Sequence, residues 1–159
     1  MADPTWLPDV LRKAGLVCDV YPGAMDRGHG DFGQIWGVVC HHTGSFGETP
    51  KGIAQHPSLG LASQLYLGRD GKYTLCGVGI AWHAGQGAWP GIPTNDANRV
   101  TIGIEAANVR VEDPLPAGVV SATWTCSSGY AACPQPSGVG AIDQTIVSLP
   151  QFASILYSI

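Results

Sequence analysis

A β-hairpin at residues 63–79 is the feature that most restricts how this chain can fold. The segment reads SQLYLGRDGKYTLCGVG and places two runs of strand-forming residues on either side of Asp70-Gly71. An Asp-Gly pair supplies the positive φ angles of a tight turn, so we expect the two runs to pair antiparallel.

Two further segments read as strands, one on each side of the hairpin in the sequence. Residues 35–40, IWGVVC, form a short, apolar and partly β-branched run that predicts a buried strand. Residues 99–108, RVTIGIEAAN, alternate Val and Ile with polar or small residues, so one face is apolar and the other presents Glu105. Together with the hairpin, these segments predict an α/β domain whose mixed sheet has at least four strands.

The first residues predict a short helix at residues 5–14. Thr5 can cap its start and Gly15 can end it. Its apolar face comprises Trp6, Leu7, Val10 and Leu11. The following residues 18–34 have Gly and Pro at several turn positions and are expected to form a loop.

Length and charge exclude several classes of function. A chain of 159 residues fits one domain with its own core. Its net charge is −4 and no block of Lys or Arg stands out, which argues against nucleic acid as a partner. No stretch approaches the roughly 18 apolar residues of a membrane span, and the charged N-terminal segment lacks the apolar centre of a secretory signal. We therefore expect no stable membrane insertion and a cytoplasmic origin.

The five cysteines are odd in number and show no CxxC spacing. This argues against a disulfide framework and against an all-cysteine zinc site. Buried thiols that pack as small apolar side chains are the favoured interpretation for Cys18, Cys40 and Cys76.

Charge is distributed unevenly along the chain. Of the 20 Asp, Glu, Lys and Arg residues, 19 lie within residues 1–113, and the remaining 46 residues contain only Asp143. A folded surface normally carries more charge than that. We therefore divide the chain into residues 1–113, which carry the recognisable motifs, and an atypical tail of low charge at residues 114–159.

Two adjacent imidazoles follow the strand at residues 35–40. Neighbouring residues of a strand point to opposite faces, so His41 and His42 cannot both continue the same row. A hydrolytic zinc site needs three side-chain ligands and an open position for water, and one of these histidines could be the first ligand. A hydrogen-bonded structural histidine is the alternative.

Glu105 is a second candidate for chemistry. A carboxylate on a strand of Val and Ile costs free energy unless it is paired or used, and a general base would occupy such a place. A solvent-facing Glu on an edge strand is the alternative.

The segment AWHAGQGAW, residues 81–89, places His83 between Trp82 and Trp89 in a Gly-rich loop. That composition suits stacking on a sugar or a peptide while the imidazole donates a hydrogen bond. Tryptophans that simply pack against the protein are the alternative.

Four segments in this order resemble the type-2 N-acetylmuramoyl-L-alanine amidases, a superfamily that includes the peptidoglycan recognition proteins. They are VVCHHTGS, SQLYLGRDGKY, AWHAGQGAWPG and NDANRVTIGIEAAN. The likeness extends from about residue 5 to about residue 113, and it is greatest to amidase domains of lysins from phages of mycobacteria and related actinobacteria.

The resemblance implies a central mixed sheet flanked by helices, one zinc ion, and cleavage of the amide between N-acetylmuramic acid and the L-alanine of the stem peptide. His41 would be a zinc ligand, and Glu105 would orient and deprotonate the zinc-bound water. His42 would point to the opposite side of the strand. The expected substrate-binding residues are His42, Trp82, His83, Asn95 and Asn98, with Trp82 and His83 on the rim of the groove. Peptidoglycan would be the substrate, and the chain would be a monomer that is released from the cytoplasm to the cell wall.

The chain departs from the family pattern in two places. Ser63-Gln64 stands where several members have a tyrosine followed by a histidine. The C-terminal segments that carry the family's other two zinc ligands are missing, and no histidine follows His83. Two functions therefore stay open: a zinc amidase, and a binding module of the same fold that recognises muramyl peptide without cleaving it. A third interpretation is that the altered tail leaves a chain that folds poorly.

Overall fold

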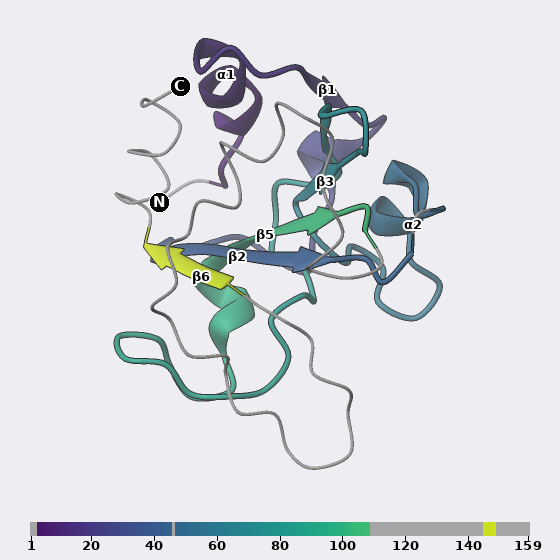
Figure 1. Ribbon diagram of the computed structural model, residues 1–159. Helices are drawn as coiled ribbons and strands as arrows, with labels where there is room; N and C mark the ends of the chain where they lie inside the picture. The colour runs from purple at the N-terminus through teal and green to yellow at the C-terminus, as the bar shows by residue number, and fades with distance from the viewer. Residues whose placement is uncertain (1–2, 46, 109–144, 149–159) are drawn as a thin grey trace.

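The computed structural model describes residues 3–45, 47–108 and 145–148. Within these ranges, six strands form one mixed sheet in the order β1-β4-β3-β5-β2-β6 (Figure 1). The strands are β1 (Cys18–Val20), β2 (Gly37–His42), β3 (Leu65–Leu67), β4 (Tyr73–Leu75), β5 (Thr101–Ala106) and β6 (Thr145–Ser148). The helices are α1 (Leu7–Lys13) and α2 (Pro50–Ala54), with short 3-10 turns η1 (Ala24–Asp26) and η2 (Ala97–Arg99). The predicted single α/β domain with a mixed sheet is confirmed.

The centre of the sheet is parallel. β5 lies between β3 and β2 and runs parallel to both. β4 pairs antiparallel with β3, and β6 pairs antiparallel with β2. Glu105 therefore belongs to a central strand, and the alternative of a glutamate on an edge strand is wrong.

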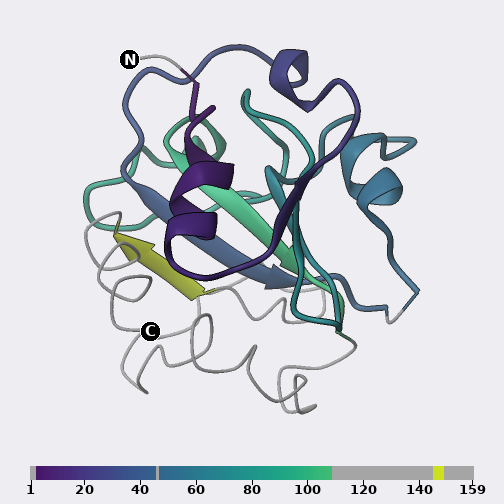
Figure 2. The same cartoon turned by 90° about the horizontal axis from the view of Figure 1, so that it is seen from above.

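Apolar side chains cover the sheet on both faces. Seen from above, α1 lies across β2 and β5 (Figure 2), and its Leu7 and Leu11 join Ile102 and Ile104 in the larger buried cluster. Ile53 and Ala54 of α2 belong to a second cluster that contains Tyr66. Since successive strand residues alternate between faces, Tyr66 points away from the face that carries Leu65 and Leu67.

The helix α1 is shorter than predicted and begins differently. Its N-cap residue is Trp6, which makes no side-chain cap, so the cap predicted for Thr5 is wrong. Trp6 is 39% exposed, whereas Leu7 and Leu11 are 1% and 0% exposed, so Trp6 does not belong to the packed face. Gly15 ends the helix as expected, with a φ of 79° that permits the Leu16 amide to donate to the Leu11 carbonyl.

The predicted hairpin is confirmed, with Leu65 opposite Leu75. Its turn is longer than a two-residue connection: the Gly71 amide donates to the Gly68 carbonyl, and the Gly68 amide donates to the Lys72 carbonyl. Gly71 has a φ of 82°, and Asp70 is not among the residues with positive φ. Asp70 contributes through its side chain, which accepts a hydrogen bond from the Lys72 amide.

Two strands of the sheet were not predicted. Residues 18–34 were expected to be a loop but contain β1, which pairs with β4, and the turn η1. Residues 145–148 of the low-charge tail form β6 on the edge of the sheet. The predicted boundary at residue 113 lies outside the described residues. Cys18, Cys40 and Cys76 are buried, as expected.

Candidate functional site

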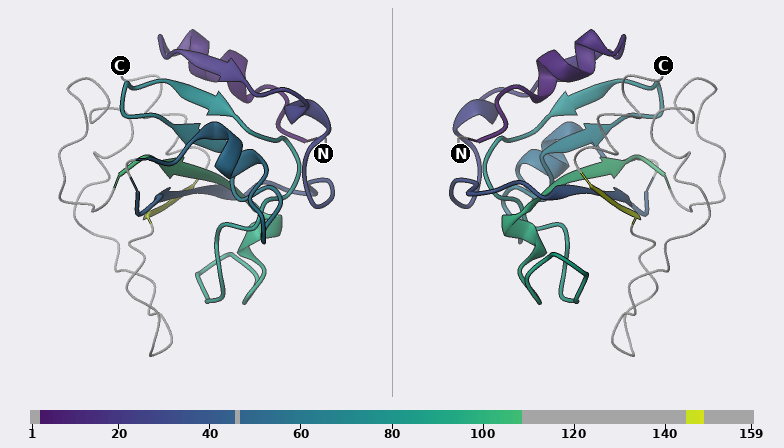
Figure 3. Two further views of the ribbon diagram at one scale, coloured as in Figure 1. Left: turned by 90° about the vertical axis from the view of Figure 1, so that its right-hand side faces the viewer. Right: turned by 90° about the vertical axis from the view of Figure 1, so that its left-hand side faces the viewer.

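A pocket of about 400 Å³ opens where β2 and β5 end. Parallel strands bring their carboxyl ends to one edge of a sheet, which is where loops can supply a site. The segment before β5 that contains η2 extends away from the sheet (Figure 3) and brings Trp82 and His83 to this pocket. The lining residues are His41, His42, Thr43, Gly44, Glu48, Ile53, His56, Leu59, Ala62, Trp82, His83 and Glu105.

His41 and Glu105 are direct neighbours in the sheet. They are register partners in the parallel pairing of β2 with β5, so their side chains project from the same face. Tyr66 on β3 is the register partner of Glu105 on its other side. Both residues line the pocket, so the structure places them in a shared cleft. Their chemical roles stay predictions.

The pKa of the Glu105 carboxyl is raised toward neutral pH. Burial, together with the nearby charge of Glu48, raises its pKa to about 7. A carboxyl with such a pKa can take a proton from water at neutral pH and return it later. This is the property that a general base requires.

His41 and His83 form an imidazole pair. Their Nε2 and Nδ1 atoms are 3.3 Å apart, and Nε2 of His83 lies 3.1 Å from the carbonyl oxygen of Thr101. A carbonyl can only accept, so Nε2 of His83 carries the proton and its Nδ1 accepts from Nε2 of His41. The Nδ1 atom of His41 therefore keeps its lone pair. Burial lowers the pKa of His41 to about 3 and that of His83 to about 4, so both rings are neutral.

A glycine and an asparagine hold His83 in place. A Cβ atom on Gly103 would lie 2.7 Å from Cγ of His83, so the imidazole rests directly on the strand because residue 103 has no side chain. The Asn98 Oδ1 atom accepts from the backbone amides of His83 and Ala84 at 2.9 and 2.8 Å. His83 therefore lies against His41 and lines the same pocket. Its contact with substrate stays a prediction.

The other predicted substrate residues fall into two groups. Trp82 and His42 line the pocket, and Nδ1 of His42 accepts a hydrogen bond from the Gly44 amide. Asn95 and Asn98 do not line it. The Asn95 Oδ1 atom accepts from the Gly87 amide at 2.9 Å, so the side-chain oxygens of both asparagines bind the backbone of this loop. Their contact with substrate stays a prediction.

Sequence reasoning missed Glu48, His56 and Tyr66. Glu48 precedes Thr49, whose hydroxyl caps α2, and Thr-Pro at a helix start is a signal that could have placed Glu48 beside the site. The Tyr66 hydroxyl donates to the Glu48 carbonyl at 2.8 Å, which fixes the loop that carries Glu48. The alternation of Leu65, Tyr66 and Leu67 could have placed Tyr66 on the face of Glu105.

Ser63 and Gln64 are the first point at which the sequence departs from the pattern of the family that it resembles. Gln64 is buried, its Oε1 accepts from the Gly103 amide at 2.6 Å, and its Nε2 donates to the Gly79 carbonyl at 2.8 Å. The side chain thus joins β5 to a loop. The buried Ser63 hydroxyl has no hydrogen-bond partner among the described residues.

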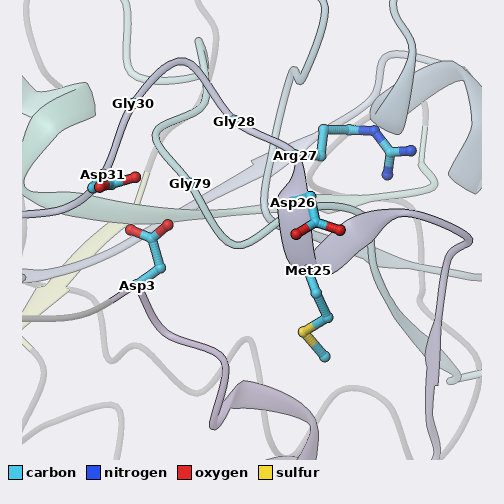
Figure 4. A pocket seen from close by; sticks show the side chains of 8 residues that line it. All are labelled: Asp3, Met25, Asp26, Arg27, Gly28, Gly30, Asp31 and Gly79. Carbon is cyan, nitrogen blue, oxygen red and sulfur yellow. The ribbon is translucent and has the colours of Figure 1, made fainter.

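A second pocket, of about 260 Å³, shares no lining residue with the first. Three aspartates border it, and the side chain of Arg27 points away from them (Figure 4). Arg27 instead donates to the carbonyls of Cys76 and Pro22 at 2.6 and 2.7 Å. The two pockets are therefore separate, and of the two only the first combines imidazoles, a carboxyl of raised pKa and an exposed tryptophan.

The family model for N-acetylmuramoyl-L-alanine amidase matches residues 31–134. The chain belongs to this amidase family. The matched range includes every residue named above for the first pocket, from His41 to Glu105. No curated protein and no solved structure matches the chain.

The zinc site that the amidase likeness implies is not completed by the described residues. They contain no group of three or more His, Cys, Asp or Glu side chains that could hold a metal ion. His41 offers one nitrogen, and a catalytic zinc usually has three protein ligands. The tail donors Cys126, Cys133 and Asp143 lie outside the described residues.

No helix among the described residues of this amidase-family chain is long and apolar enough to cross a membrane.

Proposed function

We propose that this chain is a peptidoglycan hydrolase that cleaves the amide between the lactyl group of N-acetylmuramic acid and the L-alanine of the stem peptide. Membership of the amidase family supports the reaction class. The observation that carries the proposal is the pairing of Glu105 with His41 on one face of the sheet, inside a pocket.

Glu105 is the general base in this proposal. Its carboxylate takes a proton from a water molecule whose oxygen attacks the lactyl carbonyl carbon. When the C–N bond breaks, the same proton passes to the alanine nitrogen, which leaves as a free amine. The products are a lactyl carboxylate and a peptide that begins with L-alanine.

His41 supplies a polar contact beside the reacting carbonyl. Its Nδ1 lone pair can accept a hydrogen bond or bind a cation, while its Nε2 proton is engaged by His83. Zinc is what the family likeness implies for this position. Because the described residues provide one of three ligands, we assign no step of the reaction to a metal.

The test is cleavage of purified peptidoglycan, read as newly formed N-terminal alanine. We expect the wild-type chain to release it and Glu105→Gln to be at least about a hundredfold slower, since the amide cannot accept the proton. Both proteins are assayed with added zinc and with a chelator. Equal rates for wild type and Glu105→Gln would overturn the role of Glu105.

A binding module is the second candidate function. The observation that favours it is that the described residues contain no group of three or more His, Cys, Asp or Glu side chains that could hold a metal ion. In that case the chain would bind muramyl dipeptide and retain it uncleaved, and elemental analysis of the purified protein would find no zinc. If the chain binds muramyl dipeptide and also cleaves it, this candidate function is ruled out.

We also propose that the chain acts in the lysis of bacteria by a phage. The support is the likeness of the four motifs to lysins of actinobacterial phages, which would make the chain cytoplasmic until it is released to the wall. Purified walls from actinobacteria and from unrelated bacteria, offered at equal mass, would test this. Equal cleavage of both would remove the support for a preferred actinobacterial wall.

A further inference from the structure

We propose that His29 is a positioning residue that holds the indole of Trp82 as a stacking platform for the sugar ring of the substrate. This inference rests on the proposed function and adds to it the place where the muramyl ring binds. His29 lies in the segment that was expected to be a plain loop, and no role was predicted for it.

The two rings are stacked at the mouth of the pocket. Their centroids are 4.8 Å apart and their planes differ by 16°, so the imidazole covers one face of the indole. Trp82 is still 42% exposed and lines the pocket beside Leu59, which is 38% exposed. Part of the indole therefore stays uncovered in this stack and is available to a ligand.

His29 is itself fixed by contacts with two other segments. Its ring Nε2 lies 2.8 Å from the Leu59 carbonyl, and its backbone amide donates to the Ile80 carbonyl at 2.8 Å. A carbonyl only accepts, so Nε2 carries the proton. The ring thus joins the segment before Gly60 to the segment that leads into Trp82.

Glycines allow this close assembly. A Cβ atom on Gly60 would lie 2.9 Å from Cε1 of His29, and a Cβ atom on Gly79 would lie 2.9 Å from Cα of Gly28. The Ile80 amide also donates to the Gly30 carbonyl at 2.8 Å. The backbone on both sides of His29 is therefore held against the segment that carries Trp82.

A fixed indole at a pocket mouth suits a pyranose ring. Aromatic side chains offer a large apolar face at low cost in conformational entropy, and a partner ring on the far side removes the remaining freedom. The scissile amide would lie beside Glu105, deeper in the same pocket. The sugar on the lactyl side of that amide would then reach the rim formed by Trp82 and Leu59.

The experiment compares two ligands that differ only in the sugar. Muramyl dipeptide and a lactoyl dipeptide of the same peptide sequence are titrated calorimetrically against the full chain and its variants. We expect wild type to bind muramyl dipeptide roughly tenfold more tightly, and Trp82→Ala to bind both ligands equally.

Two substitutions at residue 29 separate stacking from loop support. His29→Phe keeps an aromatic ring but loses the donor to Leu59, whereas His29→Gln keeps a donor but loses the ring. We expect His29→Phe to retain most of the preference for the sugar and His29→Gln to lose most of it. The fluorescence of Trp82, obtained by subtracting the spectrum of Trp82→Phe, should change in His29→Gln and much less in His29→Phe.

The outcomes distinguish this inference from the proposed function. If wild type binds neither ligand, the proposed function fails and the inference fails with it. If wild type binds both ligands equally, or if His29→Gln keeps the full preference for the sugar, the inference alone is overturned. Thermal melting of each variant shows whether a loss of binding comes from a loss of folding.

Discussion

Burial controls the charge of the titratable side chains at this site. Glu105 lies between Tyr66 and His41 on a central strand, and burial is the main cause of its raised pKa. Burial lowers the pKa of His41 and of His83, which favours the neutral form of both imidazoles. The site thus combines a carboxyl that titrates near pH 7 with two rings that stay uncharged.

Glu105 should make the metal-free protein less stable at higher pH. Its folded pKa of about 7 exceeds the ordinary value of 4.5, so the stability it contributes is complete below pH 4.5 and is lost as pH rises through 7. The difference corresponds to about 3 kcal/mol. Urea unfolding in a chelator should show Glu105→Gln gaining stability over wild type between pH 5 and pH 8. Parallel stability curves for the two proteins would contradict the raised pKa.

Gly103→Ala should displace His83. The added methyl would lie 2.6 Å from the Ser63 hydroxyl and 2.7 Å from the His83 ring, so one of them must move. We expect a loss of about 1–3 kcal/mol in unfolding free energy and a weaker contact between His83 and His41.

Gly33→Ala is the matched control for this substitution, because a Cβ atom at residue 33 would meet nothing within 4 Å. It should change stability by no more than about 0.5 kcal/mol. A loss at residue 103 no larger than at residue 33 would show that His83 does not rest on the strand.

At the scale of elements, the loop between Trp82 and β5 depends on Asn98. Its Oδ1 atom accepts from two consecutive amides, those of His83 and Ala84, and it is the main side-chain contact that ties this loop to the turn η2. We expect Asn98→Ala to cost about 1–3 kcal/mol of unfolding free energy, because two amides lose their acceptor.

Asn98→Asp keeps an oxygen at the same place and should retain most of the stability. Urea unfolding measures both variants. Equal losses in Asn98→Ala and Asn98→Asp would mean that the two hydrogen bonds do not hold the loop.

The elements that could be predicted are those whose signal is local. The Asp-Gly turn predicts the hairpin, and the alternation of Ile102 and Ile104 with Glu105 predicts both β5 and the face on which the carboxyl lies. β1 and β6 depend on pairing with strands that are distant in the sequence. A strand of three or four residues is too short to show an alternation of apolar and polar residues that would predict such pairing. Thr5 failed as a cap because the chain already turns into the helix at Trp6, which has helical dihedral angles.

The residues of the site also divide into those that a local signal could predict and those that it could not. His41 and Glu105 could be paired from strand periodicity and the family likeness. The backbone contacts of Asn95 and Asn98 could not be predicted, because the sequence does not show whether a polar loop residue faces substrate or backbone. Tyr66 and Glu48 join the site through a hydrogen bond between segments that only the fold brings together.

At the scale of the whole molecule, the described residues build one sheet with apolar clusters that include α1 and α2. Two buried clusters that share one sheet should unfold as one unit. We therefore expect a single sharp thermal transition that is the same by circular dichroism and by tryptophan fluorescence. A gradual loss of signal, accompanied by dye binding to exposed apolar surface, would favour the interpretation that the chain folds poorly.

The central claim is that Glu105 and His41 direct water to one amide bond of peptidoglycan. The most direct measurement is mass spectrometry of muramyl peptide incubated with the chain in heavy-oxygen water. The account predicts that one heavy oxygen enters the lactyl carboxylate, that the released alanine amine carries none, and that Glu105→Gln forms neither product. Intact muramyl peptide after incubation with wild type in the presence of zinc, or heavy oxygen at any other position, would contradict it.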